Sequence, residues 1–415
     1  MKQILLYVLL TALVLFLLMR GIIPAMVSVG TDFPNYYTSA RLLVEGKDVS
    51  RLYDDNWFQE QIHGYGMNQL GKFSPFPPMT AVVMTPLVFF SPENALRLWT
   101  VINFVLLAVA IVLVSRIANQ SLLWGAFLFL LSGHALANNF RFGQVYLILT
   151  ILVMLGYRYW INGEQKKTGL LLGLGAAIKY FPILFVVEFV ARREWKTVFF
   201  AALTVILVSA IGIVVLGPTV NGQFALKVLG HHLQGDIQNP FSPIFQSWNS
   251  LFRRWFIMDQ TRNPDPLFSS STAYLSSLFT IYGLVVTSIV LVFKASTRKF
   301  GGDAQSVHFA LLAIAGLLLL PASATYHFLL LSLPVALLLR GNDWTIPQWG
   351  LAILYCFIGF IPYHFFERFE SAGLLTLLAY PRLILMSFLY IFAIMIAWSG
   401  PLHFTERINN VRFES

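Results

Sequence analysis

A carboxylate beside a pair of aromatic residues is the first group in this sequence that suits chemistry on a hydroxyl. Asp32 follows a long apolar run and precedes Tyr36 and Tyr37. A carboxylate there can accept the proton of a sugar hydroxyl and so make its oxygen a nucleophile. The alternative is structural, with Asp32 capping a short helix that begins near Pro34. The residues alone leave both roles open.

A lysine within an apolar segment is the second candidate. Lys179 lies near the middle of the run at 168–191, beside Tyr180 and shortly before Pro182. A buried ammonium needs an anionic partner, and the phosphate of a ligand is a natural one. A lysine can also extend its aliphatic stem to the interface, but the depth of Lys179 makes that strained. Phosphate binding and an interfacial lysine are the two interpretations.

Three more polar residues lie at the edges of apolar segments. Arg141 and Gln144 belong to the stretch at 138–144, and on physical grounds alone an ordinary loop with one basic residue is the better interpretation of it. His327 stands where a later apolar segment begins. An imidazole there can bond a phosphate oxygen or hold a carboxylate, or it can pack against a neighbouring serine or backbone group.

The polar segment at 218–271 carries further candidates. Trp248, followed by Asn249, could stack on a sugar ring or sit in the interfacial aromatic belt. The neighbours His231 and His232 do not place both imidazoles on one helix face, so a metal site is weakly supported and none is expected. The residues expected to contact substrate are Tyr36, Tyr37, Gln144, Tyr180, Trp248 and Asn249.

The elements that must position these residues are membrane helices. Of the 415 residues, 57% are hydrophobic and only 11% are charged, and the mean hydropathy is +0.70. The apolar segments do not alternate as barrel strands do, and most approach the length of a spanning helix. They fall at about 3–26, 77–91, 96–115, 120–138, 144–161, 168–191, 195–217, 272–293, 306–321, 325–340, 345–363 and 381–399. We expect one all-α polytopic membrane domain over residues 1–415, with about 11–13 transmembrane helices.

Basic residues indicate the orientation of these helices. Those expected to face the cytoplasm are Arg192, Arg193, Lys196, Lys294, Arg298, Lys299, Arg340, Arg407 and Arg412. This accounts for the net charge of +9 without nucleic acid, and it places the polar segments at 30–77 and 218–271 outside. The pair Lys166 and Lys167 would then lie outside too. If they lie inside, 168–191 must enter and return as two half-helices with Lys179 at the tip, and the upstream parity must change.

The order of these pieces resembles glycosyltransferase family 87, a polyprenyl-phosphate-sugar-dependent family with the GT-C fold. The resemblance covers residues 1 to about 330; each motif alone is loose, but the ordered set is fairly specific. One departure is Phe76 before Pro77, where the family usually has tyrosine and proline. The matching stretches are 32–46, 52–54, 73–78, 86–87, 95–99, 141–144, 173–182, 246–253 and 323–327.

The resemblance implies an inverting hexosyltransferase that moves a sugar, often mannose, from a polyprenyl-phosphate donor to a lipid or glycan acceptor. It implies Asp32 as general base and His327 near the donor phosphate. With it, Lys179, His327 and Arg141 become the candidate phosphate ligands. No cofactor is expected, the partners are donor, acceptor and membrane lipids, and the site should face outward from a bacterial inner membrane. The alternative is a transporter or flippase of lipid-linked sugars, which would often show inverted repeats that we do not find here.

Overall fold

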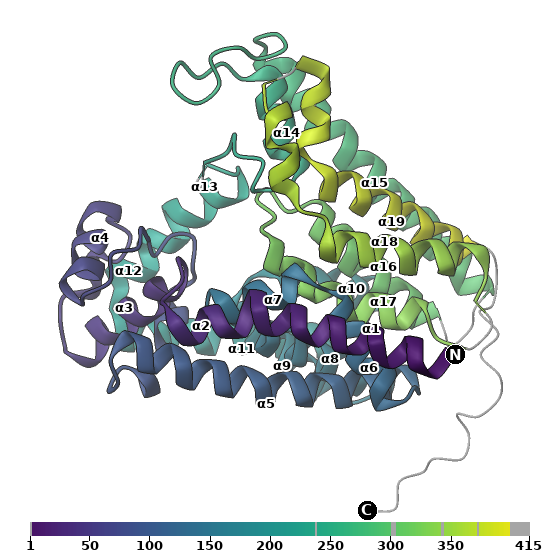
Figure 1. Ribbon diagram of the computed structural model, residues 1–415, viewed down its shortest axis with the longest axis horizontal. Helices are drawn as coiled ribbons and strands as arrows, with labels where there is room; N and C mark the ends of the chain where they lie inside the picture. Colours follow the sequence, from purple (N-terminus) through teal and green to yellow (C-terminus); the bar gives the residue numbers. More distant parts are fainter. Residues whose placement is uncertain (1, 237–238, 300–303, 342–343, 372, 399–415) are drawn as a thin grey trace, which may run out of the picture.

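The computed structural model describes residues 2–236, 239–299, 304–341, 344–371 and 373–398. Within these ranges every regular element is helical and there is no strand. Figure 1 shows the helices in two groups that lie at an angle to one another. The first group contains α1 (Lys2–Leu17), α5 (Pro92–Ala118), α6 (Leu122–Leu131), α8 (Tyr146–Ile161), α9 (Gln165–Ile178) and α11 (Trp195–Leu216). The second contains α15 (Ser271–Lys299), α16 (Ala304–Leu318), α18 (Ile346–Phe360) and α19 (Pro381–Trp398).

The predicted class, an all-α polytopic membrane protein, is confirmed. In the described part of the chain five stretches are long and apolar enough to cross a membrane alone: Ile4–Val27, Pro92–Ala118, Trp195–Leu216, Ser271–Ala295 and Pro381–Trp398. The first is α1 continued through a π-helical turn, Leu18–Ile22, into α2 (Ile23–Val27). Several other apolar segments are divided into shorter helices, so the figure of about 11–13 spans stays a prediction.

The segment at 77–91 differs from its prediction, because it is not one apolar helix. It forms two short 3-10 helices, Pro78–Val82 and Thr85–Leu87. Prolines at positions 77, 78 and 86 explain this, since proline has no N–H to donate and clashes with the preceding turn. At five and three residues these helices are shorter than a membrane span requires, so we infer no crossing between 77 and 91. Without this crossing, the parity of the segments that follow changes.

The segment at 168–191 makes up for the crossing lost at 77–91, because it forms two half-helices where one helix was the simpler prediction. Its first half is α9, and its second half is a 3-10 helix, Phe181–Phe185, continued by α10 (Val186–Ala191). Trp160, at the end of α8, donates its indole N–H to both carboxylate oxygens of Glu194, at 3.0 and 2.9 Å, so the start of α9 and the end of α10 meet. The first half thus leaves the side where Trp160 and Glu194 meet, and the second half returns to it. Lys166 and Lys167 join the other basic residues, and the conflict in the predicted topology disappears.

We call this side of the molecule the basic end. It is defined by Lys166, Lys167, Arg192, Arg193, Lys196 and Arg340. Arg340 reaches back to the hydroxyl groups of Tyr157 and Ser306, both at 3.2 Å, which ties the second helical group to the first. Arg407 and Arg412, which were expected on the same side, lie outside the described residues.

The break within 168–191 has a local cause and a rigid support. Lys179 is extended (φ −147°, ψ 120°), and Pro182 follows where an α-helix would need a backbone donor. Before the break, Gly169 and Gly173 let α9 approach α11 closely. A Cβ on either glycine would lie 2.5 or 2.6 Å from a carbonyl oxygen of α11, so only glycine permits this packing. The tip of the hairpin is therefore held in one place.

The two long polar segments lie together at the opposite side, which we call the loop end. The first contains α3 (Phe33–Val44) and α4 (Asp55–Gly64), and the second contains α12 (Pro218–Gln223), α13 (Leu229–Leu233) and α14 (Trp248–Phe256). The rings of Tyr53 and Phe224 stack at 6.3 Å and join the two segments. In Figure 1 α3, α4 and α12 cluster at one extremity, and α14 lies at the top of the second helical group.

Candidate active site

A cavity of about 480 Å³ lies at the loop end, where segments distant in sequence meet. The first polar segment contributes Asp32, and the break after α9 contributes Lys179 and Tyr180. His327 enters from a 3-10 helix, Thr325–Leu331, that continues into α17 (Ser332–Leu338). Four residues singled out from the sequence therefore line one enclosure, as a shared substrate site requires.

Asp32 occupies the N-cap position of α3, but its side chain makes no capping hydrogen bond. Instead, Gln144 donates its amide N–H to Asp32 Oδ2 at 2.6 Å, and its Oε1 accepts a hydrogen bond from Tyr36 at 2.7 Å. Burial raises the pKa of Asp32, while the Gln144 hydrogen bond and the charge of Lys179 lower it. The capping alternative thus fails, and the carboxylate has the features of a general base.

Lys179 stands at the tip of the hairpin and is only 9% exposed. Its Nζ lies 3.8 Å from the centre of the Phe76 ring, with Tyr36 and Tyr146 at 5.8 and 5.9 Å. Among the described residues it has no ion pair or hydrogen bond through Nζ, so aromatic faces are its nearest partners. A phosphate in the cavity would satisfy this ammonium. Phe76 is the residue that departs from the family pattern, and it keeps the ring that faces Lys179.

His327 is oriented by the backbone. The N–H of Ala324 donates to His327 Nδ1 at 3.2 Å, and the ring lies 5.1 Å from both Tyr146 and Tyr326. Because Nδ1 accepts, a neutral imidazole carries its proton on Nε2. The packed-histidine alternative therefore holds for one nitrogen only. The other is left as a donor, which suits a phosphate oxygen.

His232 is a cavity residue that the sequence reasoning considered only as a weak metal ligand. It is buried on α13, whereas its neighbour His231 is exposed, and its Nε2 contacts the hydroxyl of Tyr180. Burial, and then the charge of Lys179, lower the pKa of His232 to about 4, so the ring is neutral at pH 7. His232 brings the second polar segment onto the cavity, a contact that sequence spacing does not reveal.

The comparison with known proteins now decides the family. Residues 75–321, more than half of the chain, match the family model of Glycosyltransferase family 87. The chain belongs to glycosyltransferase family 87. A stretch of 160 residues is also 29% identical to the polyprenol-phosphate-mannose-dependent alpha-(1-2)-phosphatidylinositol mannoside mannosyltransferase of Mycobacterium tuberculosis. This stretch covers 34% of the chain and 36% of that relative, so the alignment spans about a third of the relative's length.

Six of the residues expected to bind substrate or the donor phosphate in this family 87 protein do not line the cavity. Two of them, Tyr36 and Gln144, form the hydrogen-bonded chain to Asp32 described above. The other four make different contacts. Arg141 is exposed, and its guanidinium lies 5.5 Å from the centre of the Phe142 ring. Tyr37 donates to the carbonyl of Phe90 at 2.7 Å. The Asn249 amide is bonded to Gln234 and Tyr274, and the Trp248 ring packs 5.4 Å from that of Phe252. Substrate contacts by all six residues stay predictions.

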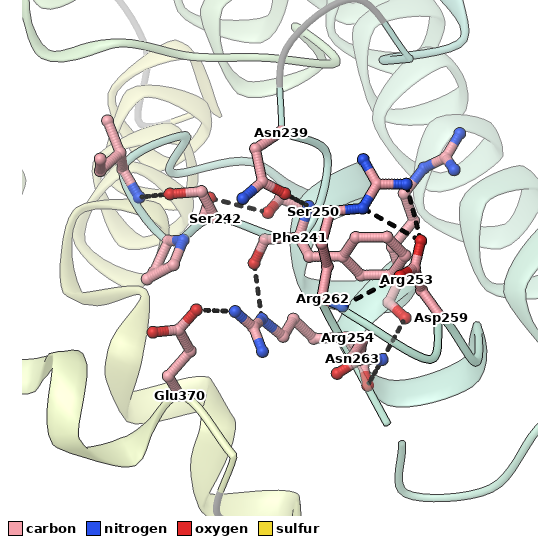
Figure 2. A network of polar contacts seen from close by, with 12 residues as sticks. Asn239, Phe241, Ser242, Ser250, Arg253, Arg254, Asp259, Arg262, Asn263 and Glu370 are labelled. Atoms are coloured by element: carbon pink, nitrogen blue, oxygen red, sulfur yellow. Dashed lines mark hydrogen bonds and ion pairs between the residues drawn. The ribbon is translucent and has the colours of Figure 1, made fainter. Parts of the chain in front are cut away.

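Trp248 and Asn249 lie at the start of α14, and neither lines the cavity. Figure 2 shows a polar network on this helix, in which Arg254 donates to the Phe241 carbonyl at 2.5 Å and pairs with Glu370. The network also holds Arg262 on Asp259 at 2.6 Å. In this part of a family 87 chain, polar residues fasten the second loop segment to the C-terminal helices.

Two tyrosines of the site were not singled out from the sequence. Tyr146 and Tyr326 line the cavity, and their rings lie 5.2 Å apart. Tyr326 directly precedes His327 and Tyr146 follows Gln144 by two positions. Proximity to those residues was the only signal, because buried tyrosines are common in membrane helices.

Proposed function

We propose that this protein is an inverting glycosyltransferase that moves a hexose, with mannose favoured, from a polyprenyl-phosphate donor to a glycolipid or glycan acceptor. Family membership supports the reaction class. The name of the mycobacterial relative supports the donor and a glycolipid acceptor. The observation that carries the proposal is the carboxylate of Asp32, which sits at a helix cap position without capping and shares a cavity with Lys179 and His327.

The proposed reaction is a single displacement at the anomeric carbon. An acceptor hydroxyl attacks C1 of the donor sugar and gives its proton to Asp32, while the bond from C1 to the phosphate oxygen breaks. The electron pair leaves with the polyprenyl phosphate, whose charge Lys179 and the Nε2–H of His327 would meet. Attack opposite to the leaving group inverts the configuration, as in other single displacements at a sugar.

The lining of the cavity also suits a donor whose phosphate lies at Lys179 and His327 and carries an apolar chain. Phe181, Leu320 and Leu330 form an apolar part of the wall near Lys179 and His327. A prenyl chain attached to the phosphate could leave the cavity past these side chains. Basic residues favour the cytoplasmic side of a membrane, so the basic end would face the cytoplasm and the cavity would open outward. For a bacterial chain this is the outer face of the inner membrane.

The test uses purified protein in lipid with radiolabelled polyprenyl-phosphate mannose and a crude acceptor lipid extract. We expect wild-type protein, but not Asp32→Asn, to move label into a new glycolipid and to release polyprenyl phosphate. Equal transfer by both proteins would overturn the role of Asp32. If neither moves label from mannose or from other hexose donors, the proposed reaction is wrong.

A transporter or flippase of lipid-linked sugars is the competing function. It would also bind a phosphate at Lys179, but it has no need for a base at Asp32. Release of labelled donor to the opposite leaflet without a new glycosidic bond, unaffected by Asp32→Asn, would favour this function.

A further inference from the structure

One wall of the cavity contains a buried amide that the proposed reaction has not used. Asn35 is 7% exposed and lines the cavity, and its Oδ1 is fully buried without a hydrogen-bond partner among the described residues. Buried polar atoms are almost always bonded in folded proteins, so this unbonded oxygen, which packs against Gly71 in the cavity wall, marks Asn35 as a cavity residue whose amide the protein alone does not satisfy. The amide offers a donor and an acceptor, which is the pair that a sugar hydroxyl requires.

The neighbouring chain keeps room for this amide. A Cβ on Gly71 would lie 2.2 Å from Asn35 Oδ1, so only glycine fits there without displacing the side chain. Gly71 is itself held, because its N–H donates to Gln59 Oε1 at 2.8 Å and the Gln59 amide donates to the carbonyl of Gln69 at 3.1 Å. Gly71 is therefore fixed in place against one side of the amide.

Asn35 lies close to Asp32, the proposed general base. It follows Asp32 by three positions at the start of α3, and residues three apart share a helix face. Both side chains line the cavity. A hydroxyl group bonded to Asn35 would thus belong to a molecule whose other hydroxyl groups are within reach of Asp32.

The chemistry of this wall differs from that of the wall with Lys179. Beyond Asn35 the lining continues with Asp55, Asn56 and Gln59, all from α4. Asp55 pairs with Lys72 at 3.7 Å. Lys72 lines the cavity too, so this ion pair brings no net charge to the wall, and the amide groups beside it suit a neutral ligand rich in hydroxyl groups.

We propose that Asn35, with the α4 residues Asp55 and Asn56, forms the acceptor subsite and binds a hydroxyl-rich headgroup such as a sugar or cyclitol. This inference rests on the proposed transfer reaction, whose donor phosphate lies at the other wall. Asn35 holds the acceptor beside Asp32, and the donor makes no contact with it.

The test compares two-substrate kinetics of Asn35→Ala, Gly71→Ala and the matched control Asn68→Ala, whose exposed side chain does not line the cavity. The donor is polyprenyl-phosphate mannose and the acceptor probe is octyl α-mannoside. For Asn35→Ala and Gly71→Ala we expect the acceptor KM to rise roughly three- to tenfold, as for the loss of one or two neutral hydrogen bonds. The donor KM and the control should not change. A rise in the donor KM alone, or no change in either KM, would overturn the subsite.

A binding assay with octyl α-mannoside tests the acceptor subsite independently of the proposed transfer reaction. If wild-type protein transfers no sugar, the proposed function fails, and saturation-transfer NMR with octyl α-mannoside still decides the subsite. Binding weakened by Asn35→Ala and by Gly71→Ala, but not by Asn68→Ala, supports it. Equal binding by all three variants overturns it. Gly71→Ala leaves Asn35 in the chain, so it also guards against a folding defect caused by loss of the asparagine.

Discussion

Replacing Gln144 tests whether its amide tunes the base. Gln144 donates to Asp32 Oδ2 at 2.6 Å, and this bond lowers the pKa of the buried carboxyl. Gln144→Met keeps the length of the side chain but removes the donor. A hydrogen bond to a charged group contributes about 1.5–3 kcal/mol. Since about 1.4 kcal/mol corresponds to one pKa unit, the pKa of Asp32 should rise by about 1–2 units.

The assay is kcat/KM for sugar transfer as a function of pH. A general base must be deprotonated, so activity falls as the pH drops through its pKa. In Gln144→Met the acidic limb of the profile should therefore move about 1–2 units to higher pH. Gln61→Met, on α4 and away from the cavity, is the matched control. If Gln144→Met lowers the rate equally at every pH, then Gln144 supports packing only and the reasoning about its amide is refuted.

Three further predictions concern other parts of the molecule. Lys179→Met should raise the donor KM about 10–100-fold, because a charge-assisted bond to the phosphate is lost. Lys227→Met, at an exposed position, is the control and should leave the donor KM unchanged. If Lys179→Met and wild-type protein have the same donor KM, Lys179 does not bind the phosphate. Because burial raises the folded-state pKa of Asp32, the fold loses stability as the pH rises above the ordinary pKa of an aspartate and the buried carboxyl ionises. Asp32→Asn should therefore raise Tm at pH 7.5, with the difference shrinking as the pH falls. An unchanged Tm would contradict this. Gly173→Val should cost about 1–3 kcal/mol through overpacking against α11, and Gly283→Val, with open space around it, should be neutral in thermal unfolding in detergent.

The sequence predicted the helical membrane class and the two polar segments because both depend on composition alone. It misjudged 77–91, since hydropathy does not register the prolines that prevent one continuous α-helix there. The hairpin at 168–191 was one of two alternatives. Basic residues could not choose between them, whereas the contact between Trp160 and Glu194 does, and contacts between distant segments are not visible in a single sequence.

The residues of the candidate site were likewise predicted only in part from the sequence. Asp32, Lys179 and His327 were found because ionisable groups in apolar surroundings are unusual and so conspicuous. Arg141 was expected at the phosphate only through the family resemblance, and it lies outside the cavity. Asn35 was passed over, because a neutral amide at a helix start is ordinary in sequence. Asn35 becomes a candidate only in the structure, where it lines the cavity and packs against Gly71.

The assembly of the cavity from early, middle and late parts of the chain has a consequence for biosynthesis. Asp32 emerges from the ribosome soon after the first helix, but His327 follows only after most of the helices have been made. N-terminal portions of a chain generally fold first during synthesis. A nascent or prematurely terminated chain therefore holds Asp32 and Lys179 but lacks Tyr326 and His327, which complete the lining of the cavity. Only a chain that has been made and inserted nearly to its end can close this cavity.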